Sequence, residues 1–424
     1  MKKILILSYY HQFLKITSYM EHINSFKKYS KNKVYNLNTE LGFPKKLKDI
    51  KFDIIVLHYS LFGNWLFNAL KNLRRGIAYE IDRKFLEYIK NSKAQKVAFC
   101  QDEYRFCQKR FNFLNDYKID VVYSLLDPKY YDSTYYKYSN VKKVYHTLTG
   151  YVDSTLIENS NKLYIPHEKR TLDISYRARE LPYYLGKGAQ EKVDIAKEFI
   201  KRLEGSDLQI DINYTEASRL YGDAWSQMLA NSKTVIGVEG GASIFDIDGK
   251  AFEVYSSALS ENPRITKESI FALLEPWEEK IIYRTIGPRI FEAAAFKVCQ
   301  VLFEGEYQGI LKPMVHYIPL KKDFSNFKEV MDMIKNNELV GRIVNNAYED
   351  LIMSNKYSYG KFIENFENNF SNEQNIDLVF NVNEINEMLM KDYKIRYLIA
   401  KIKSLRYKQF IGRKYLGKLI KYVK

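Results

Sequence analysis

Short apolar runs alternate with amphipathic segments along roughly the first 160 residues of the chain. Most runs hold four to six aliphatic or aromatic residues and lie between polar turns. They predict strands at Lys3–Ser8, Asp53–His58, Lys96–Gln101, Asp120–Ser124 and Val144–Leu148. Between them, apolar positions recur at helical spacing in Trp65–Leu73 and Arg83–Ile89. Short strands that alternate with helices are typical of βαβ units and a parallel sheet.

The same pattern restarts in the second half of the chain. Apolar runs predict strands at Thr171–Tyr176, Leu208–Ile212, Thr234–Val238, Val298–Phe303 and Val315–Ile318. Helical spacing predicts helices at Val193–Leu203, Tyr221–Leu229, Pro288–Phe296, Asn326–Ile334, Glu338–Met353 and Tyr359–Phe366. Roughly fifty residues before Pro288 continue neither pattern, and we expect them to form an insertion.

The length of 424 residues exceeds what one hydrophobic core usually organises. We therefore predict an α/β protein with two Rossmann-like domains, residues 1–165 and 166–370, that face each other across a cleft. The polar stretch Asn369–Asn375 leads into residues 371–424, a linker and a basic helical tail. Because ligands of open parallel sheets bind at the carboxyl ends of strands, residues that follow strands are candidate site residues.

A hydrophobic fraction of 46% and a charged fraction of 28% are typical of a globular protein and exclude general disorder. Cys100, Cys107 and Cys299 form neither a CxxC pair nor a cluster with histidine, so we expect no zinc site and a reducing compartment. The apolar run Ile4–Leu7 is too short for a signal peptide, and no stretch approaches the length of a membrane span. We therefore expect a cytoplasmic protein.

The basic excess of the chain is concentrated in the tail. Residues 391–424 hold twelve Lys or Arg and one acid, Asp392, in a chain of formal net charge +15. Apolar residues recur among the cations of 395–424, which favours a helix lying on an anionic membrane, here the inner face of the plasma membrane. The alternatives are a helix that packs back on the body and, last, a nucleic-acid arm. The nearly balanced charge of the body argues against nucleic acid as a partner.

The segment Ser175–Lys192 places cations and glycines where a predicted strand gives way to a helix. Guanidinium groups, exposed backbone N–H groups and the positive end of a helix dipole together suit a diphosphate. The alternative is a surface loop with solvated arginines. The candidate binding residues of this segment are Arg177, Arg179, Gly186, Gly188 and Lys192.

A second segment, Ile286–Gly305, combines a helix start with the strand that follows it. Pro288 suits the first turn of a helix, and Arg289 and Glu292 lie three residues apart on one helical face. Glu292 can accept hydrogen bonds from a ribose, and Arg289 can contact a phosphate. The alternative is an intrahelical ion pair on a solvated face.

The second segment resembles the donor-binding signature of GT-B glycosyltransferases of the group 1 kind, R-x-F-E-A-x-A-x-G before a strand. The similarity covers residues 171–335 and is closest to CgeB-like proteins and to bacterial capsule or lipopolysaccharide enzymes. It implies that Glu292 contacts the nucleotide ribose, and it places Arg177 with the phosphate-binding basic residues. The chain departs from the family at two places, with Phe296-Lys297 instead of glycine and Tyr9-Tyr10-His11 instead of a glycine-rich loop.

A third segment, Val238–Lys250, follows a predicted strand with a pair of glycines. In the GT-B comparison it lies near the donor sugar, which makes Glu239 and Ser243 candidates for contacts with sugar hydroxyls. Asp246 and Asp248 are similar to a metal-binding DxD motif, but two aspartates before a glycine more often form a turn. We expect no metal, and no cofactor beyond the nucleotide sugar as co-substrate.

Polar residues at the ends of the N-terminal strands are candidates for acceptor binding and catalysis. They would face the cleft if the sheet is parallel, and a carboxylate there can take the proton from an attacking hydroxyl. The alternative for each is a structural role, such as a helix cap. The candidates are Asp102, Glu103 and His11.

These features together predict an enzyme that moves a sugar from a nucleotide diphosphate donor to a glycan or lipid-linked acceptor in bacterial surface polysaccharide synthesis. Retention of the anomeric configuration is implied by the resemblance alone. Two alternatives stay open, a nucleotide-sugar 2-epimerase of the same architecture and a non-catalytic protein that binds nucleotides or membranes.

Overall fold

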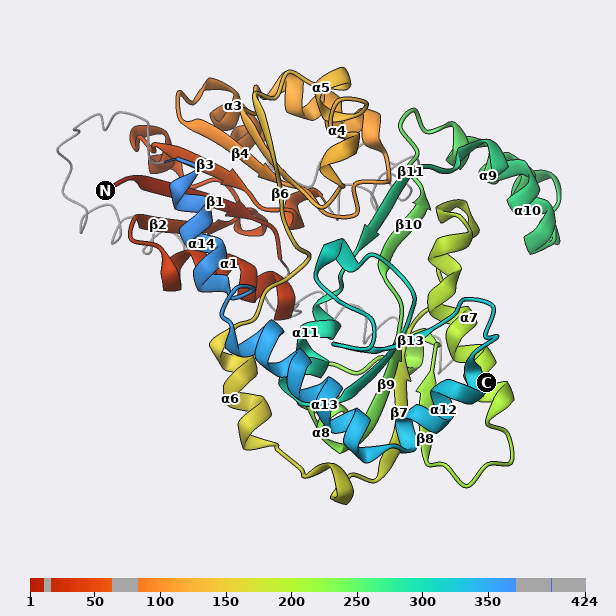
Figure 1. Ribbon diagram of the computed structural model, residues 1–424. Helices are drawn as coiled ribbons and strands as arrows, with labels where there is room; N and C mark the ends of the chain where they lie inside the picture. The colour runs from red at the N-terminus through yellow and green to blue at the C-terminus, as the bar shows by residue number, and fades with distance from the viewer. Residues whose placement is uncertain (11–16, 63–82, 371–397, 399–424) are drawn as a thin grey trace, which may run out of the picture. The chain divides into compact units, whose positions relative to one another are not determined.

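The computed structural model describes residues 1–10, 17–62, 83–370 and Leu398. These residues form a six-stranded and a five-stranded sheet with helices packed on them, so the predicted α/β class is confirmed (Figure 1). His11, the helix expected at Trp65–Leu73 and, apart from Leu398, the basic tail 371–424 lie outside the described residues. Among the helices that are described, none combines the length and the apolar character needed to cross a bilayer.

The six-stranded sheet is built from the N-terminal part of the chain in the order β2-β1-β3-β4-β5-β6. The pairings β1–β2, β1–β3 and β5–β6 are parallel. Its strands are β1 (Lys3–Ser8), β2 (Lys33–Asn38), β3 (Ile54–Leu57), β4 (Gln95–Phe99), β5 (Val121–Ser124) and β6 (Lys143–His146). The helices of this part are α1 (Thr17–Tyr29), α3 (Arg83–Asn91), α4 (Cys107–Asp116), α5 (Tyr135–Tyr138) and α6 (Ser154–Lys162). Every residue of β3 is buried, as expected of an interior strand in a parallel sheet.

The described residues divide into two compact units. One contains residues 1–10, 31–62, 83–97 and Leu398, and the other contains residues 17–30 and 98–370. The division therefore crosses β4 and groups α1 with the second unit. The boundary expected at residue 165 is a different division and stays a prediction. The site described below lies entirely in the second unit.

The five-stranded sheet has the order β13-β12-β9-β7-β8, and its pairings are parallel. Its strands are β7 (Leu172–Arg177), β8 (Ile210–Asn213), β9 (Ser232–Gly237), β12 (Cys299–Phe303) and β13 (Ile318–Leu320). The accompanying helices are α7 (Lys187–Arg202), α8 (Asp223–Asn231), α11 (Pro288–Ala295), α12 (Phe327–Lys335), α13 (Asn337–Tyr348) and α14 (Tyr359–Asn368). Ile174, Phe199, Val301 and Ile343 are buried together between this sheet, α7 and α13. The helices and four of the five strands predicted for this half are thus present, whereas the strand expected at Val315–Ile318 begins only at Ile318, after a turn.

The expected insertion is an antiparallel hairpin with two helices between its strands. The hairpin consists of β10 (Gly240–Ile244) and β11 (Glu278–Thr285), and α9 (Lys250–Glu261) and α10 (Lys267–Leu274) extend from its end, away from β7 and β9 (Figure 1). The periodicity did not predict these two strands. β10 begins with two glycines, and β11 has several exposed polar positions, so neither strand has the apolar run of a central strand.

Candidate functional site

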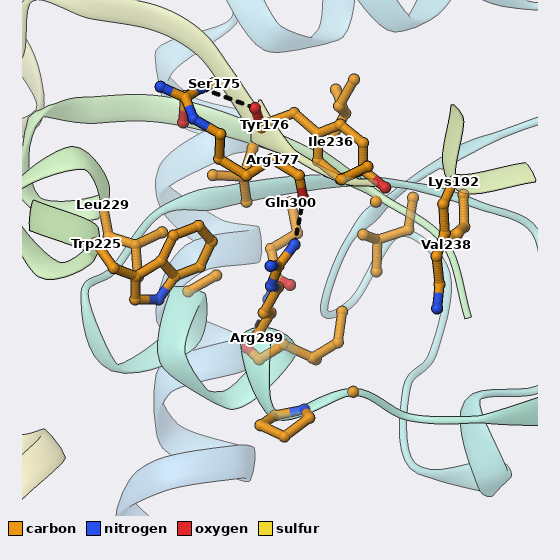
Figure 2. A pocket seen from close by; sticks show the side chains of 18 of the residues that line it. Ser175, Tyr176, Arg177, Lys192, Trp225, Leu229, Ile236, Val238, Arg289 and Gln300 are labelled. Carbon is orange, nitrogen blue, oxygen red and sulfur yellow. Dashed lines mark hydrogen bonds between the residues drawn. The ribbon is translucent and has the colours of Figure 1, made fainter. Parts of the chain in front are cut away.

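A cavity of about 280 Å³ opens at the carboxyl ends of β7 and β9. This is where ligands bind in open parallel sheets. Figure 2 shows Arg289 of α11 in the middle of the cavity, with Trp225 of α8 on one side and Lys192 of α7 on the other. Four of the predicted donor-site residues line this cavity, namely Arg177, Arg179, Lys192 and Arg289.

The charged residues that line the cavity are all cations. Besides the four residues above, Arg219 contributes a fifth cationic side chain, and the lining contains neither Asp nor Glu. Arg219 forms an ion pair with Glu216 at 2.7 Å and lies over the ring of Tyr221. Because opposite charges attract more strongly in a partly dry cavity than in water, this lining favours an anionic ligand.

Arg289 and Glu292 are arranged around one indole ring. The Arg289 guanidinium lies over the Trp225 ring at 4.8 Å from its centroid, and it also donates a hydrogen bond to the backbone carbonyl of Arg177. The Trp225 indole N–H donates to Glu292 Oε2 at 2.7 Å. Burial raises the pKa of Glu292 above its ordinary value, and the Trp225 hydrogen bond and the Arg289 charge oppose that rise. The intrahelical ion pair considered from sequence is not formed between these two described side chains; each contacts Trp225 instead.

Arg177 uses its guanidinium within the protein. Its Nη1 donates to the carbonyls of Tyr176 and Asp211 at 2.9 and 2.8 Å, its Nη2 to Asp211 Oδ2 at 2.7 Å, and its Nε to the Ser218 carbonyl at 3.1 Å. These bonds join the ends of β7 and β8 to the loop that follows β8. The residue lines the cavity, but most of its donors are already engaged.

Lys192 and Arg179 are the cations with the fewest partners. The side chain of neither residue forms a hydrogen bond or ion pair with any described residue. Burial lowers the pKa of Lys192 to about 8, with help from Arg289, Arg179 and Arg284, while Asp102 acts in the opposite direction. An added anion would relieve this repulsion between cations.

The glycines before α7 allow close approach by other parts of the chain. Gly186 has φ +86°, and a Cβ atom there would collide with Ser243 Oγ; a Cβ on Gly188 would collide with the Arg284 guanidinium. The first N–H groups of α7 are occupied as well, because Lys187 N donates to the carboxylate of Glu278 and Gly188 N donates to Ser243 Oγ at 2.8 Å. The helix N-terminus thus has protein acceptors at the place where sequence reasoning expects phosphate.

Glu239 and Asp246 are held by backbone N–H groups outside the cavity lining. Glu239 Oε1 accepts from Tyr307 N at 2.7 Å, and burial raises the pKa of this carboxyl. Asp246 accepts from the N–H groups of Ala251 and Phe252 at the start of α9, which matches the interpretation as a turn. No group of three or more His, Cys, Asp or Glu within the described ranges is placed to hold a metal ion.

Asp102 and Glu103 differ sharply in surroundings although they are adjacent. Glu103 is fully buried and accepts hydrogen bonds from Ser124 Oγ at 2.6 Å, Leu125 N at 2.7 Å and the Tyr135 hydroxyl. This placement gives no support to the expected role of Glu103 in acceptor binding or as a base. Asp102 has a left-handed backbone (φ +51°), is exposed, and interacts electrostatically with Lys192. Of the two carboxylates, Asp102 is therefore the one near the cation-lined cavity.

Two residues that line the cavity, Trp225 and Arg219, are absent from the sequence predictions, and so is Glu21, which interacts electrostatically with Glu292. Trp225 and Arg219 lie in and just before a predicted helix, and nothing local distinguishes their side chains. Glu21 of α1 has its pKa raised to about 7, first by burial and then by the nearby carboxylates of Glu292 and Asp153.

No protein-family model matches the sequence, and no curated protein matches it either. Among solved structures, the fold is similar to that of HepE from Anabaena, crystallised with UDP (TM-score 0.48, 10% identity, 88% of this chain and 100% of that chain). It is also similar to a glycosyltransferase from Rickettsia africae ESF-5 (TM-score 0.46, 11% identity, 88% and 99%). A third similar structure is sucrose-phosphate synthase from Thermosynechococcus elongatus (TM-score 0.46, 8% identity, 88% and 98%). At this distance the role of each residue must come from its own contacts.

Proposed function

We propose that the protein is a glycosyltransferase of GT-B architecture that binds a nucleotide diphosphate sugar in the cavity at the ends of β7 and β9. The observation that carries the proposal is the cavity lining, which holds five cationic side chains and no carboxylate. Glu292 lies behind this lining and is held by Trp225, whose ring also carries the Arg289 guanidinium. A diphosphate supplies the missing negative charge, and a carboxylate such as Glu292 is a suitable acceptor for ribose hydroxyls.

In this mechanism the cations stabilise the departing group. Arg289, Lys192 and Arg179 contact the diphosphate, where negative charge develops as the sugar–phosphate bond breaks. Arg177 fixes the ends of β7 and β8, so that its backbone carbonyl can position the Arg289 guanidinium. Asp102 contributes to the acceptor side, where its carboxylate orients the attacking hydroxyl and accepts its proton as the oxygen bonds to the sugar carbon. We further propose retention of configuration, a glycan or lipid-linked acceptor in surface polysaccharide synthesis, and a cytoplasmic location on the inner membrane face.

The test is a thermal-shift titration with uridine, guanosine, adenosine and cytidine diphosphate sugars. At a concentration ~100 times the dissociation constant, binding adds about 2.7 kcal/mol to the free energy of unfolding. We expect this shift for one nucleotide family in the wild type and its loss in Glu292→Ala and Lys192→Ala. The exposed residues Glu204 and Lys201 supply matched control variants, Glu204→Ala and Lys201→Ala. Equal shifts in all four variants would contradict the proposed site.

Turnover separates the proposal from its alternatives. A glycosyltransferase releases free nucleotide diphosphate in proportion to the acceptor supplied. A nucleotide-sugar 2-epimerase would yield an isomerised sugar with no acceptor present, and a binding protein would yield neither product. Product analysis of one donor with and without a mixed glycan acceptor distinguishes the three outcomes.

A further inference from the structure

A second hollow of about 110 Å³ lies at the carboxyl end of β6, beside α14. The strand end contributes Tyr145, His146 and Thr147, while Asn365 of α14 and Asn369 just after it line the other side. The volume is less than half of that of the donor cavity at about 280 Å³, so the hollow suits a ligand smaller than a nucleotide sugar. It is distinct from the donor cavity, because the two share no lining residue.

The apolar part of this hollow consists of aromatic rings held rigidly by one another. Tyr123 and Tyr145 are cross-strand neighbours on β5 and β6, with ring centroids 5.3 Å apart. Tyr151 stacks on Phe362 of α14 at 4.7 Å and an interplanar angle of 27°. The face of such a ring is apolar and carries partial negative charge, which attracts polarised C–H groups.

The polar part of the hollow consists of two amides, a lysine, His146, Thr147 and tyrosine hydroxyls. Asn369 Nδ2 donates to the Tyr123 hydroxyl at 2.9 Å, which leaves the amide oxygen of Asn369 available. The side chains of Asn365 and Lys356 form no hydrogen bond with any described residue, and no Asp or Glu lines the hollow. The hollow thus offers both hydrogen-bond donors and acceptors, and it holds no carboxylate that would favour a cationic ligand.

We propose that this hollow binds one pyranose ring of the glycan acceptor. A pyranose has an apolar face of C–H groups and an equatorial belt of hydroxyls, so it matches rigid aromatic faces bordered by amides. The proposal deepens the proposed function and rests on it. Parallel β5 and β6 end at one edge of the sheet, and Asp102 follows β4, the neighbour of β5. The hollow is then an acceptor subsite, separate from the sugar that is transferred.

The experiment is saturation-transfer NMR on the full chain with a panel of methyl glycosides and neutral oligosaccharides. We expect at least one glycan to bind the wild type and to bind Tyr145→Ala and Asn365→Leu about tenfold more weakly. The exposed Tyr164 provides the matched control Tyr164→Ala, which should bind as the wild type does. The thermal shift by the nucleotide sugar verifies that each variant is folded and should be unchanged.

The two proposals fail in different ways. If no glycan of the panel binds while a nucleotide sugar does, or if both variants bind glycan as tightly as the wild type, the acceptor subsite is wrong and the donor site stands. If a glycan binds in the predicted manner but no nucleotide sugar does, the sugar subsite stands and the transferase is wrong.

Discussion

At the scale of single residues, Trp225 organises the donor side of the cavity. Its ring face makes a cation–π contact with the Arg289 guanidinium, and its indole N–H donates a hydrogen bond to Glu292. One side chain therefore positions both motif residues. Arg289 and Glu292 could be singled out from sequence because their segment resembles the R-x-F-E motif. Their partner could not, because it comes from another helix, 67 positions away in the chain.

Replacing Trp225 with Phe should separate its two contacts. The variant keeps a ring face for Arg289 but removes the N–H that holds Glu292, and a hydrogen bond to a charged group contributes about 1.5–3 kcal/mol. We expect nucleotide diphosphate to bind about tenfold more weakly in Trp225→Phe, and weaker still in Trp225→Leu, as measured by isothermal titration calorimetry. Trp277→Phe is the control, because Trp277 lies just before β11 and does not line the cavity. Unchanged affinity in both Trp225 variants would show that the indole does not position Glu292.

Glu21 should make stability depend on pH near neutrality. The folded protein holds this proton up to about pH 7, whereas the unfolded chain releases it near 4.5, so the folded state binds more protons between these values. Stability from this group is therefore fully present below the unfolded pKa and is lost as the pH rises through about 7. We expect Glu21→Gln to raise the melting temperature more at about pH 8 than at about pH 5. Parallel melting curves across that range would contradict the assignment.

At the scale of elements, the hairpin β10–β11 completes the start of α7. Both acceptors for the first N–H groups of that helix, Glu278 and Ser243, come from the hairpin. The sequence pattern predicted β7, α7 and the glycines between them, since these are local signals. It could not show that the glycines admit Ser243 and Arg284, because that depends on an insertion packing against the turn.

Removing the acidic cap of α7 should affect stability and leave donor binding intact. A carboxylate at a helix N-terminus contributes about 1 kcal/mol through N–H hydrogen bonds and the helix dipole. We expect Glu278→Ala to lose about that much free energy of unfolding in urea titrations, with Glu279→Ala as the neighbouring control. Nucleotide affinity should stay constant. Tighter nucleotide binding in Glu278→Ala alone would indicate that the phosphate competes with this carboxylate for the N-terminus of α7.

At the scale of the whole molecule, the two sheets could be predicted because buried parallel strands are apolar on both faces. The division into units could not, since periodicity shows elements and not their partners. Phe26 of α1 packs edge to face on Phe366 of α14, with centroids 5.1 Å apart, although the two residues stand near opposite ends of the described chain. The edge strand β2, with its polar sequence KVYNLN, also escaped the pattern.

The basic tail carries most of the net charge of the chain, so its effect concerns the molecule as a whole. Deleting residues 395–424 should abolish sedimentation with vesicles that contain anionic lipid, since a cluster of Lys and Arg among apolar residues binds such surfaces. Vesicles of neutral lipid are the control. Sedimentation that is unchanged by the deletion would show that the tail is not what binds the membrane.

The enclosed carboxyl of Glu103 has a consequence for how the chain assembles. Its oxygens are satisfied by Ser124, Leu125 and Tyr135 nearby, and by the Tyr283 hydroxyl at 3.3 Å from 180 positions downstream. A fragment that stopped at the expected boundary near residue 165 would bury this acid without Tyr283. The surroundings of Glu103 are therefore expected to be completed only once the segment around Tyr283 has packed, because this contact closes a long loop of the chain.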